Sequence, residues 1–204
     1  HIQQMAAAHL AAEGYDVLRF NLQAQDFLLR HATLKTHAAD VQAVIAQQAS
    51  AYNKLFLIGH SYGGPTVMLA QPSQAAAICL WDPSFDLPAL WARMEFTDLG
   101  DIALLNFGGV EVVVGQAMVE EGRGDDFKAA ACLELSAQLA KPIKVVSASS
   151  GDEYVVYQAN RQSWHSAGHQ DNCRVLVPGS DHCFTTAEAL NQLLAETKDW
   201  FARF

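Results

Sequence analysis

The sequence predicts an α/β protein in which a mostly parallel sheet carries helices on both faces. Short apolar runs that suit buried strands alternate with helix-like segments along the chain. This alternation is typical of parallel strands joined by helical crossovers. The chain has 204 residues, of which 50% are hydrophobic and 17% are charged. Such a chain is expected to form one soluble globular domain over residues 1–204.

The first part of the chain shows the alternation directly. Alanine-rich residues before Gly14 predict a helix that ends there, because glycine commonly follows a helix C-terminus. A strand that ends at Asp82-Pro83 is bounded by a loop signal. In order, the expected elements are a helix at 2–13, a strand at 15–22, a helix at 36–48, and strands at 55–58 and 76–81.

The later part resumes the alternation after an interruption. Residues 84–124 break the pattern with scattered aromatic residues, a Gly108-Gly109 pair and a valine-rich run. The segment at about 84–141 is therefore expected to form a cap-like insertion over one end of the sheet. Beyond residue 124, the sequence predicts helices at 125–139 and 153–164, strands at 142–147 and 173–177, and a last helix opened by a capping box at 185–188.

Charge and hydropathy disfavour several classes of partner. The formal net charge is −9, which argues against nucleic acid and against anionic membrane surfaces as partners. No apolar run approaches the roughly 18 residues that a membrane-spanning helix needs. The expected partner is a small molecule, and the sequence does not define the oligomeric state.

The four cysteines favour a reducing compartment and hence a cytoplasmic location. None belongs to a C-x-x-C pair, which disfavours a zinc site or a redox motif. Cys79 and Cys132 are interpreted as small core residues. The predicted strand between Cys173 and Cys183 would hold these two apart, so reduced thiols are favoured over a disulfide. No signal peptide is evident, although a chain that begins at His1 is compatible with a removed leader.

The most informative stretch is Gly59-His60-Ser61-Tyr62-Gly63-Gly64. It follows a predicted strand and precedes a helix-like segment, which is the order of a nucleophile elbow. A side chain on either flank of Ser61 is expected to collide with the backbone, and Gly59 and Gly63 remove those side chains. The Ser61 hydroxyl would then project from the end of the sheet, above a helix N-terminus.

A serine hydroxyl needs a base and an orienting carboxylate to act as a nucleophile. Asp152 follows the strand predicted at 142–147, and His182 follows the strand predicted at 173–177. Both therefore lie at the carboxyl edge of the sheet, where Ser61 also lies and where ligand sites of parallel sheets gather. The sequence predicts Ser61 as nucleophile, His182 as base and Asp152 as acid.

Two other carboxylates are alternatives for the acid. Glu153 is the immediate neighbour of Asp152. Asp82 ends the strand after the elbow helix and lies at the same edge. Asp181 is less suitable, because direct adjacency to His182 in sequence rarely gives the orientation that is needed.

Other histidines suit the site less well. His60 is next to Ser61 in sequence but is expected to point away from it on the strained turn. His165 and His169 have a spacing that metal ligands can use, but Gly168 lies between them and no glutamate motif is nearby, so a metal site there is disfavoured.

The arrangement resembles the α/β-hydrolase superfamily, in particular its serine esterases and lipases. The resemblance covers nearly the whole chain and rests on the elbow at 59–64, on Gly151-Asp152-Glu153-Tyr154-Val155 and on Gly179-Ser180-Asp181-His182. It implies a triad of Ser61, Asp152 and His182, with no metal or organic cofactor. It also implies an oxyanion donor at the backbone N–H of Tyr62 and a small cap between Asp82 and Pro142.

The chain departs from the family pattern at its start. Family members usually have strands and a His-Gly-type oxyanion loop before the segment that resembles residues 2–22, and this chain begins at about that point. N-terminal strands are therefore expected to be absent or reduced, and the second oxyanion donor is undefined. In addition, Gln23-Ala24-Gln25-Asp26 stands where many members have a glycine-rich turn.

The leading functional hypothesis is cleavage of a small carboxylic ester through an acyl-enzyme intermediate. Cleavage of thioesters or amides, acyl transfer and perhydrolysis use the same triad and remain alternatives. A non-catalytic, hydrolase-like ligand-binding protein is the second hypothesis, motivated by the departure at the start of the chain. Side chains that would line an acyl pocket, or else simply pack the cap, are Trp81, Phe85, Trp91, Met94, Phe96 and Phe107.

Overall fold

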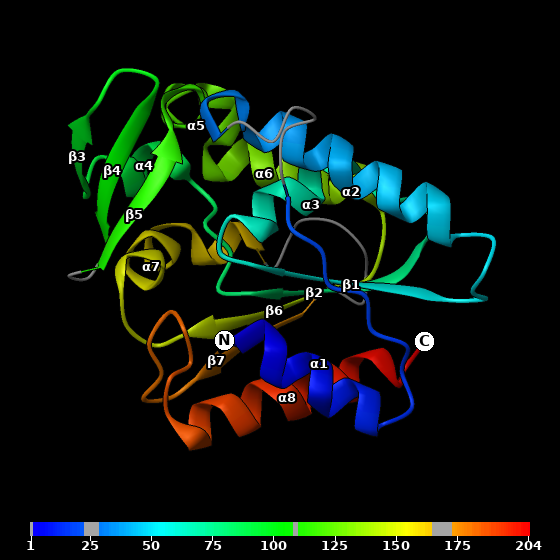
Figure 1. Cartoon of the computed structure of the whole chain (residues 1–204). Helices are drawn as coiled ribbons and strands as arrows, with labels where there is room; N and C mark the ends of the chain where they lie inside the picture. Colours follow the sequence, from blue (N-terminus) through cyan, green and yellow to red (C-terminus); the bar gives the residue numbers. More distant parts are fainter. Residues whose placement is uncertain (1, 23–28, 108–109, 165–172) are drawn as a thin grey trace.

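The centre of the protein is a four-stranded sheet with the order β1-β2-β6-β7. The computed structural model describes residues 2–22, 29–107, 110–164 and 173–204. All three ladders of the sheet are parallel, so the four strands end at the same edge (Figure 1). The strands are β1 (Leu55–His60), β2 (Ala75–Trp81), β6 (Ile143–Ala148) and β7 (Cys173–Val177).

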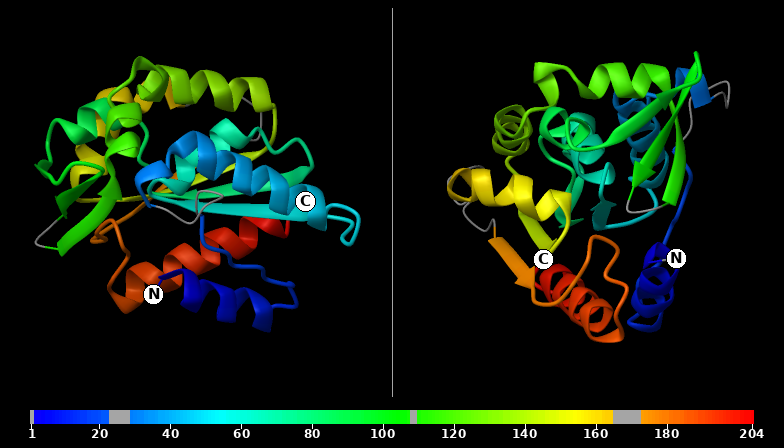
Figure 2. Two further views of the ribbon diagram at one scale, coloured as in Figure 1. Left: turned by 45° about the horizontal axis from the view of Figure 1, so that its top comes forward. Right: turned by 90° about the vertical axis from the view of Figure 1, so that its left-hand side faces the viewer.

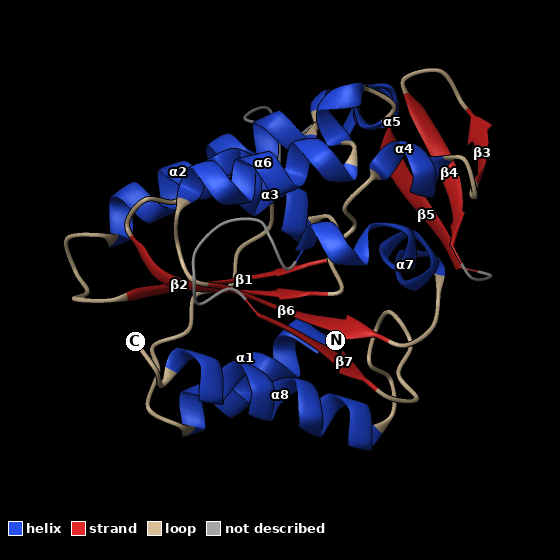
Figure 3. Ribbon diagram, turned by 180° about the vertical axis from the view of Figure 1, so that it is seen from behind, coloured by secondary structure: helices blue, strands red, loops and turns tan. Residues whose placement is uncertain are grey.

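Helices cover both faces of this sheet, which confirms the predicted fold class. On one face lie α1 (Ile2–Ala12) and α8 (Ala187–Phe201), and on the other lie α2 (Leu34–Gln48), α3 (Gly63–Ala70) and α6 (Ala129–Leu139) (Figures 1 and 3). Alternate residues of β2 serve the two faces. Cys79 and Trp81 belong to the core against α8, whereas Ile78 and Leu80 belong to the core shared with α3 and α6.

Capping side chains set where two of the helices begin. Thr33 precedes α2, and its hydroxyl accepts from the backbone N–H of Thr36 in a reciprocal capping box. Before α8 the cap is Thr186, whose hydroxyl accepts from the N–H of Ala189. The capping box predicted at 185–188 is therefore not formed: the N-cap is Thr186, one residue later, and the hydroxyl of Thr185 instead donates to the carboxylate of Asp181.

A second, antiparallel sheet lies beyond the carboxyl ends of the central strands (Figures 1 and 2). Its strands pair in the order β3-β4-β5, with α4 before them and α5 after them. Trp91 of α4 joins this region to the elbow, since its ring lies 5.3 Å from that of Tyr62 and 5.1 Å from that of Phe96. The elements here are α4 (Leu87–Trp91), β3 (Glu95–Asp98), β4 (Ile102–Phe107), β5 (Val110–Gly115) and α5 (Gln116–Gly122).

The remaining elements are short connections and one helix beside the site. Helix α7 (Asp152–Trp164) follows β6, and the 3-10 turns are η1 (Leu29–His31) and η2 (Asp125–Phe127). Among the described helices, none has the combination of length and apolarity that crossing a bilayer requires. The four cysteines, all of them described, form no disulfide, and Cys79 and Cys132 are buried as expected.

The strand predicted at 15–22 is not formed. These residues are irregular, and Val17, Leu18 and Phe20 are between 39% and 57% exposed. Their composition suits a strand, but a strand also needs a neighbour that bonds its backbone N–H and C=O groups. Within the described part of the chain, β1 pairs with β2 alone, and residues 15–22 form no ladder with its other edge.

Candidate active site

The turn after β1 has the strained geometry of a nucleophile elbow. Ser61 has φ of 55°, in the left-handed region that side chains rarely adopt. Its N–H donates to the carbonyl of Trp81 at 3.1 Å, and its carbonyl accepts from the N–H of Gly64 at 2.9 Å. These bonds tie the turn to the end of β2 and to the first turn of α3, so the Ser61 hydroxyl stays at the carboxyl edge of the sheet.

Two glycines, Gly59 and Gly64, make this close turn feasible. Gly64 is not one of the two flanking glycines that the motif indicates. A Cβ atom at Gly59 would lie 2.5 Å from the carbonyl oxygen of Gly63, so the prediction for Gly59 is supported. A Cβ at Gly63 would meet nothing within 4 Å, so the collision predicted there is wrong. The crowded position is Gly64, where a Cβ would overlap the Cβ of Pro83.

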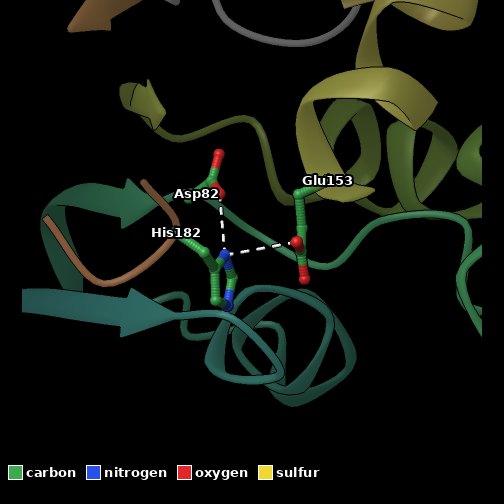
Figure 4. Close-up of side chains that lie close together, drawn as sticks. All are labelled: Asp82, Glu153 and His182. Atoms are coloured by element: carbon green, nitrogen blue, oxygen red, sulfur yellow. Dashed lines mark hydrogen bonds and ion pairs between the residues drawn. The ribbon is translucent and has the colours of Figure 1, made fainter. Parts of the chain in front are cut away.

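Asp82 and His182 form the closest charged pair of the site (Figure 4). Oδ2 of Asp82 lies 2.7 Å from Nδ1 of His182, and Oδ1 of Asp82 accepts from the backbone N–H of Ala148 at 3.0 Å. Both side chains are buried. Because both carboxylate oxygens are engaged, Asp82 is fixed with one oxygen toward the imidazole. It therefore favours the tautomer of His182 that has its proton on Nδ1.

Asp152, the acid favoured by the sequence, does not make this contact. It is the first residue of α7, and its Oδ1 lies 2.6 Å from Nε of Arg93. Both partners are substantially exposed. A carboxylate in the first turn of a helix is favoured by the helix dipole and needs no partner from the sheet edge. The structure therefore brings Asp82, the second alternative, to His182 and leaves Asp152 outside.

Glu153, the other alternative, also faces His182. It is the second residue of α7 and turns inward, with Oε2 lying 3.4 Å from Nδ1 of His182 (Figure 4). Its other oxygen, Oε1, accepts a hydrogen bond from Oγ of Ser84 at 3.1 Å. Glu153 is only 5% exposed. The imidazole thus has two carboxylates on its Nδ1 side.

Ser84 connects Glu153, one of these two carboxylates, to the elbow. Its Oγ lies 3.1 Å from Oγ of Ser61, and its N–H donates to the Ser61 carbonyl at 3.1 Å. Sequence reasoning missed Ser84. Its only signal was its place two residues after Asp82, and nothing in the sequence indicates that the chain turns its side chain back toward Ser61.

His60 is part of the site, because its ring packs against that of His182. The sequence analysis predicted only that His60 points away from Ser61. The ring centroids lie 4.9 Å apart, and Nε2 of His60 lies 2.8 Å from the carbonyl oxygen of His182. Burial lowers the pKa of His60, and the neighbouring charge of His182 lowers it further, to about 4. A neutral His60 therefore donates from Nε2 and holds the His182 loop against the end of β1.

Burial and charge act in opposite directions on the two central groups. Burial opposes protonation of His182, but the hydrogen bond to Asp82 and the charges of Glu153 and Asp82 outweigh it, so its pKa is raised above 6.5. Burial raises the pKa of Glu153, against the lowering effect of His182. In Figure 4, the second ring nitrogen of His182 points toward the turn that follows β1.

The backbone N–H of Tyr62, the oxyanion donor that the resemblance implies, lies at the start of α3. Among the described residues it has no hydrogen-bond acceptor, although the neighbouring N–H groups of Ser61 and Gly64 are engaged. A free N–H beside Ser61 at the start of a helix is a donor of the kind that a developing oxyanion can use. Within the described part of the chain, no second donor is assigned.

The residues considered for an acyl pocket do not lie together. Trp81 faces the other side of the sheet, where its Nε1 donates to Thr197 of α8 at 3.0 Å, so it lines no pocket at the site edge. Phe85 is buried in the core under α3 and α6. Trp91, Met94 and Phe96 lie on the side of Tyr62, toward the antiparallel sheet. The side chain of Phe107 lies outside the described part.

A small cavity adjoins the carboxylates of Asp82 and Glu153. It has a volume of about 20 Å³, and Asp82, Ser147, Glu153 and Arg174 are among the residues that line it. Ligand atoms of Asp82, Glu153 and His182 lie within 4.8 Å of one another, a spacing that a metal site would also have. The short bond from His182 to Asp82 already uses the nitrogen in question, so we attribute the grouping to hydrogen bonding. His165 and His169 lie outside the described residues.

Comparisons with known structures agree on the fold. The esterase domain of a Rhodothermus marinus protein superposes with a TM-score of 0.71 at 17% identity, covering 99% of this chain and 80% of that one. A structure from the work on LipS and LipT, two metagenome-derived lipolytic enzymes, gives 0.72 at 18%, covering 100% and 88%. A monoacylglycerol lipase of Paleococcus ferrophilus gives 0.62 at 14%, covering 85% and 77%.

The sequence comparisons give one family and no individual relative. No curated protein sequence is found to match the chain. The model of the alpha/beta hydrolase family matches residues 2–196, which is nearly the entire length. That span includes the elbow at Ser61 and both strand ends that supply Asp82 and His182. The chain therefore belongs to the alpha/beta hydrolase family.

Proposed function

We propose that this protein is a serine hydrolase that cleaves a small carboxylic ester through an acyl-enzyme intermediate. The observation that carries the proposal is the buried Asp82–His182 pair, 2.7 Å apart, at the sheet edge where Ser61 stands on its strained turn. An imidazole with a carboxylate on Nδ1 presents an unprotonated Nε2 as a base. In the proposed triad, Asp82 takes the role that the sequence analysis gave to Asp152.

The reaction follows from the placement of these groups. Ser61 Oγ attacks the ester carbonyl carbon while its proton passes to Nε2 of His182, and the Tyr62 N–H donates to the oxygen that becomes negative. The intermediate collapses, the C–O bond to the alcohol breaks, and His182 returns the proton to the leaving oxygen. Water then attacks the acyl-enzyme with the same proton transfers, which releases the acid and restores Ser61.

The region beyond the elbow supports an apolar acyl group of modest size. The rings of Tyr62, Trp91 and Phe96 form a continuous row from the elbow to the antiparallel sheet. We infer that this sheet, within the segment at 84–141, acts as a cap whose aromatic side chains contact the substrate. The esterase, lipolytic and lipase names of the similar structures support an ester over an amide or thioester.

Labelling with a fluorophosphonate tests the proposal. The probe forms a bond to an activated serine with loss of fluoride, so mass spectrometry should find it on Ser61. The Ser61→Ala variant should not be labelled there, and its kcat on a short-chain ester should fall by roughly a million-fold, as in other triad enzymes. A loss of less than about tenfold would show that Ser61 is not the nucleophile.

The same experiment decides between the enzyme and a ligand-binding protein. A folded protein in which Ser61 resists the probe would support a non-catalytic, hydrolase-like binder. Circular dichroism on the same sample establishes that the protein is folded.

A further inference from the structure

The Ser61 hydroxyl has a hydrogen-bond partner that a simple triad does not include. Within the described residues that partner is Oγ of Ser84, at 3.1 Å. Ser84 in turn bonds Oε1 of Glu153 at 3.1 Å, and Oε2 of Glu153 lies 3.4 Å from Nδ1 of His182. Ser84 and Glu153 are 1% and 5% exposed, so neither has bulk water as an alternative partner. A buried row of polar groups thus runs from Ser61 through Ser84 and Glu153 to His182.

The direction of the protons along this row depends on Glu153. A hydroxyl has a single proton to donate, and an ionised carboxylate can only accept. While Glu153 is ionised, Ser84 must give its proton to Glu153 and accept from Ser61. The proton of Ser61 then points at Ser84 and is unavailable to His182.

A protonated Glu153 reverses the row. Its carboxyl group donates to Oγ of Ser84, and Ser84 turns its own proton toward Oγ of Ser61. The Ser61 proton is then free to point at Nε2 of His182, which is the arrangement that nucleophilic attack requires. No bond to carbon is made or broken in this change, and the proton comes from solvent.

We propose that Ser84 and Glu153 are positioning residues that set the direction of the Ser61 proton, so that ionised Glu153 holds the nucleophile in a resting arrangement. This inference rests on the proposed serine hydrolase function. Two protonation states would then control the attack by Ser61: His182 must be unprotonated, and Glu153 must be protonated.

The surroundings of Glu153 permit it to exchange a proton. The cavity of about 20 Å³ beside it has room for a water molecule and is lined by polar groups, including Ser147 and Arg174. Burial raises the pKa of Glu153, which favours its protonated form. The other titratable or charged side chains that face Glu153 or His182 are His60, Tyr62, Asp82, Tyr157, Arg174, Asp181 and Cys183.

Most of these neighbours keep one charge state near neutral pH. His60 is neutral, with a pKa lowered by burial to about 4, whereas burial raises the pKa of Tyr62 and leaves it neutral. Burial lowers the pKa of Arg174 to about 9, so it remains a cation. Hydrogen bonds from Thr185 outweigh the effect of burial and lower the pKa of Asp181, which remains an anion. A change in Ser61 reactivity with pH is therefore assigned to His182 and Glu153.

The test is the pH dependence of the rate at which a fluorophosphonate labels Ser61. In the unaltered protein the rate should rise as His182 loses its proton and then fall about tenfold as Glu153 ionises, the size expected of a hydrogen bond to a charged group. In Ser84→Ala and in Glu153→Gln the fall should disappear and leave a plateau at high pH. A merely structural role would lower the rate at all pH values and keep the fall.

Matched controls separate this effect from general damage. Glu121→Gln removes another carboxyl group whose pKa burial raises, where it accepts from the backbone of Leu34 away from the site. Ser136→Ala removes a buried hydroxyl that bonds the carbonyl of Cys132 in α6. Both controls should keep the fall at high pH. Because Gln has the shape of Glu, Glu153→Gln keeps the test valid even if Ser84→Ala fails to fold.

Three results would overturn the inference. They are an unaltered protein without a fall at high pH, a fall that persists in folded Glu153→Gln, and a fall that persists in folded Ser84→Ala. If Ser61 of the folded, unaltered protein is not labelled at any pH, the proposed function itself fails and this inference fails with it. Labelling that lacks the predicted pH response leaves the hydrolase in place and removes only the positioning role.

Discussion

The ends of β2 and β6 each supply an aspartate at the same edge of the sheet, yet the two residues have opposite environments. Asp82 follows β2 in a left-handed turn, with φ of 39°, and is 2% exposed. Asp152 comes four residues after β6, at the first turn of α7, and pairs with Arg93 near the surface. Position along the chain places both at the edge, but only one of them reaches the imidazole.

The difference lies in how the rest of each carboxylate is held. The second oxygen of Asp82 accepts from the N–H of Ala148, the last residue of β6, so the neighbouring strand orients Asp82. Asp152 has the N-terminus of its own helix and a flexible Arg93 as partners, and neither directs it toward His182. The end of β6 therefore orients Asp82, which follows the neighbouring strand β2. The loop after β6 leads its own aspartate, Asp152, toward the surface.

Replacing Asp82 gives the largest effect that this comparison predicts. In Asp82→Asn the amide can still accept from Ala148, but its NH2 group would face Nδ1 of His182 and favour the tautomer with the proton on Nε2. That tautomer cannot accept the Ser61 proton, so kcat should fall about 10⁴-fold on a short-chain ester, as in other triad enzymes.

The result for Asp82→Asn also decides between the two buried acids. Thermal denaturation should show that the variant folds, since its size and its bond to Ala148 are retained. A loss of less than about tenfold, together with a loss of orders of magnitude in Glu153→Gln at all pH values, would assign the orienting role to Glu153 instead.

A smaller effect is expected where the elbow packs against the turn that carries Asp82. In Gly64→Ala the new Cβ would overlap Pro83, which follows Asp82, so the turn after β2 must shift. Overpacking of this kind should lower the free energy of unfolding by about 1–3 kcal/mol and should also lower kcat. Gly63→Ala is the matched control, because a Cβ there meets nothing within 4 Å.

The two glycine variants make the prediction discriminating. Urea denaturation of Gly63→Ala should show an unchanged or slightly increased stability, by up to about 1 kcal/mol, because alanine restricts the unfolded chain. If Gly63→Ala were the more destabilising of the two, the packing described for the elbow would be incorrect.

The fold was largely predictable because its signals are local. Apolar runs separated by helix-like segments locate β1, β2, β6 and β7 and their parallel order of crossovers. The failure at residues 15–22 has a non-local cause, since a suitable composition forms a strand only where a neighbouring strand offers its backbone. Within the described residues, β1 is paired only with β2, and residues 15–22 are paired with neither strand.

The site was predictable only to the level of the sheet edge. The elbow motif and the histidine after the last strand locate Ser61 and His182, because each depends on a strand end. Which acid turns inward depends on side-chain directions in two loops. The contact of Ser84 with Ser61 depends on the chain folding back after Pro83, and no spacing in the sequence specifies it.

The smallest effect is expected at the end of β6. In Asp152→Asn the contact with Arg93 loses its charge, but a pair this exposed contributes only about 0.2–1 kcal/mol. The free energy of unfolding should therefore change by less than about 1 kcal/mol, and kcat/KM should stay within about twofold, because the Asp82–His182 contact is untouched. Urea denaturation and ester hydrolysis measure the two quantities. A loss of orders of magnitude in kcat/KM would mean that α7 can present Asp152 to His182, and the contrast between the two strand ends would then describe a resting arrangement only.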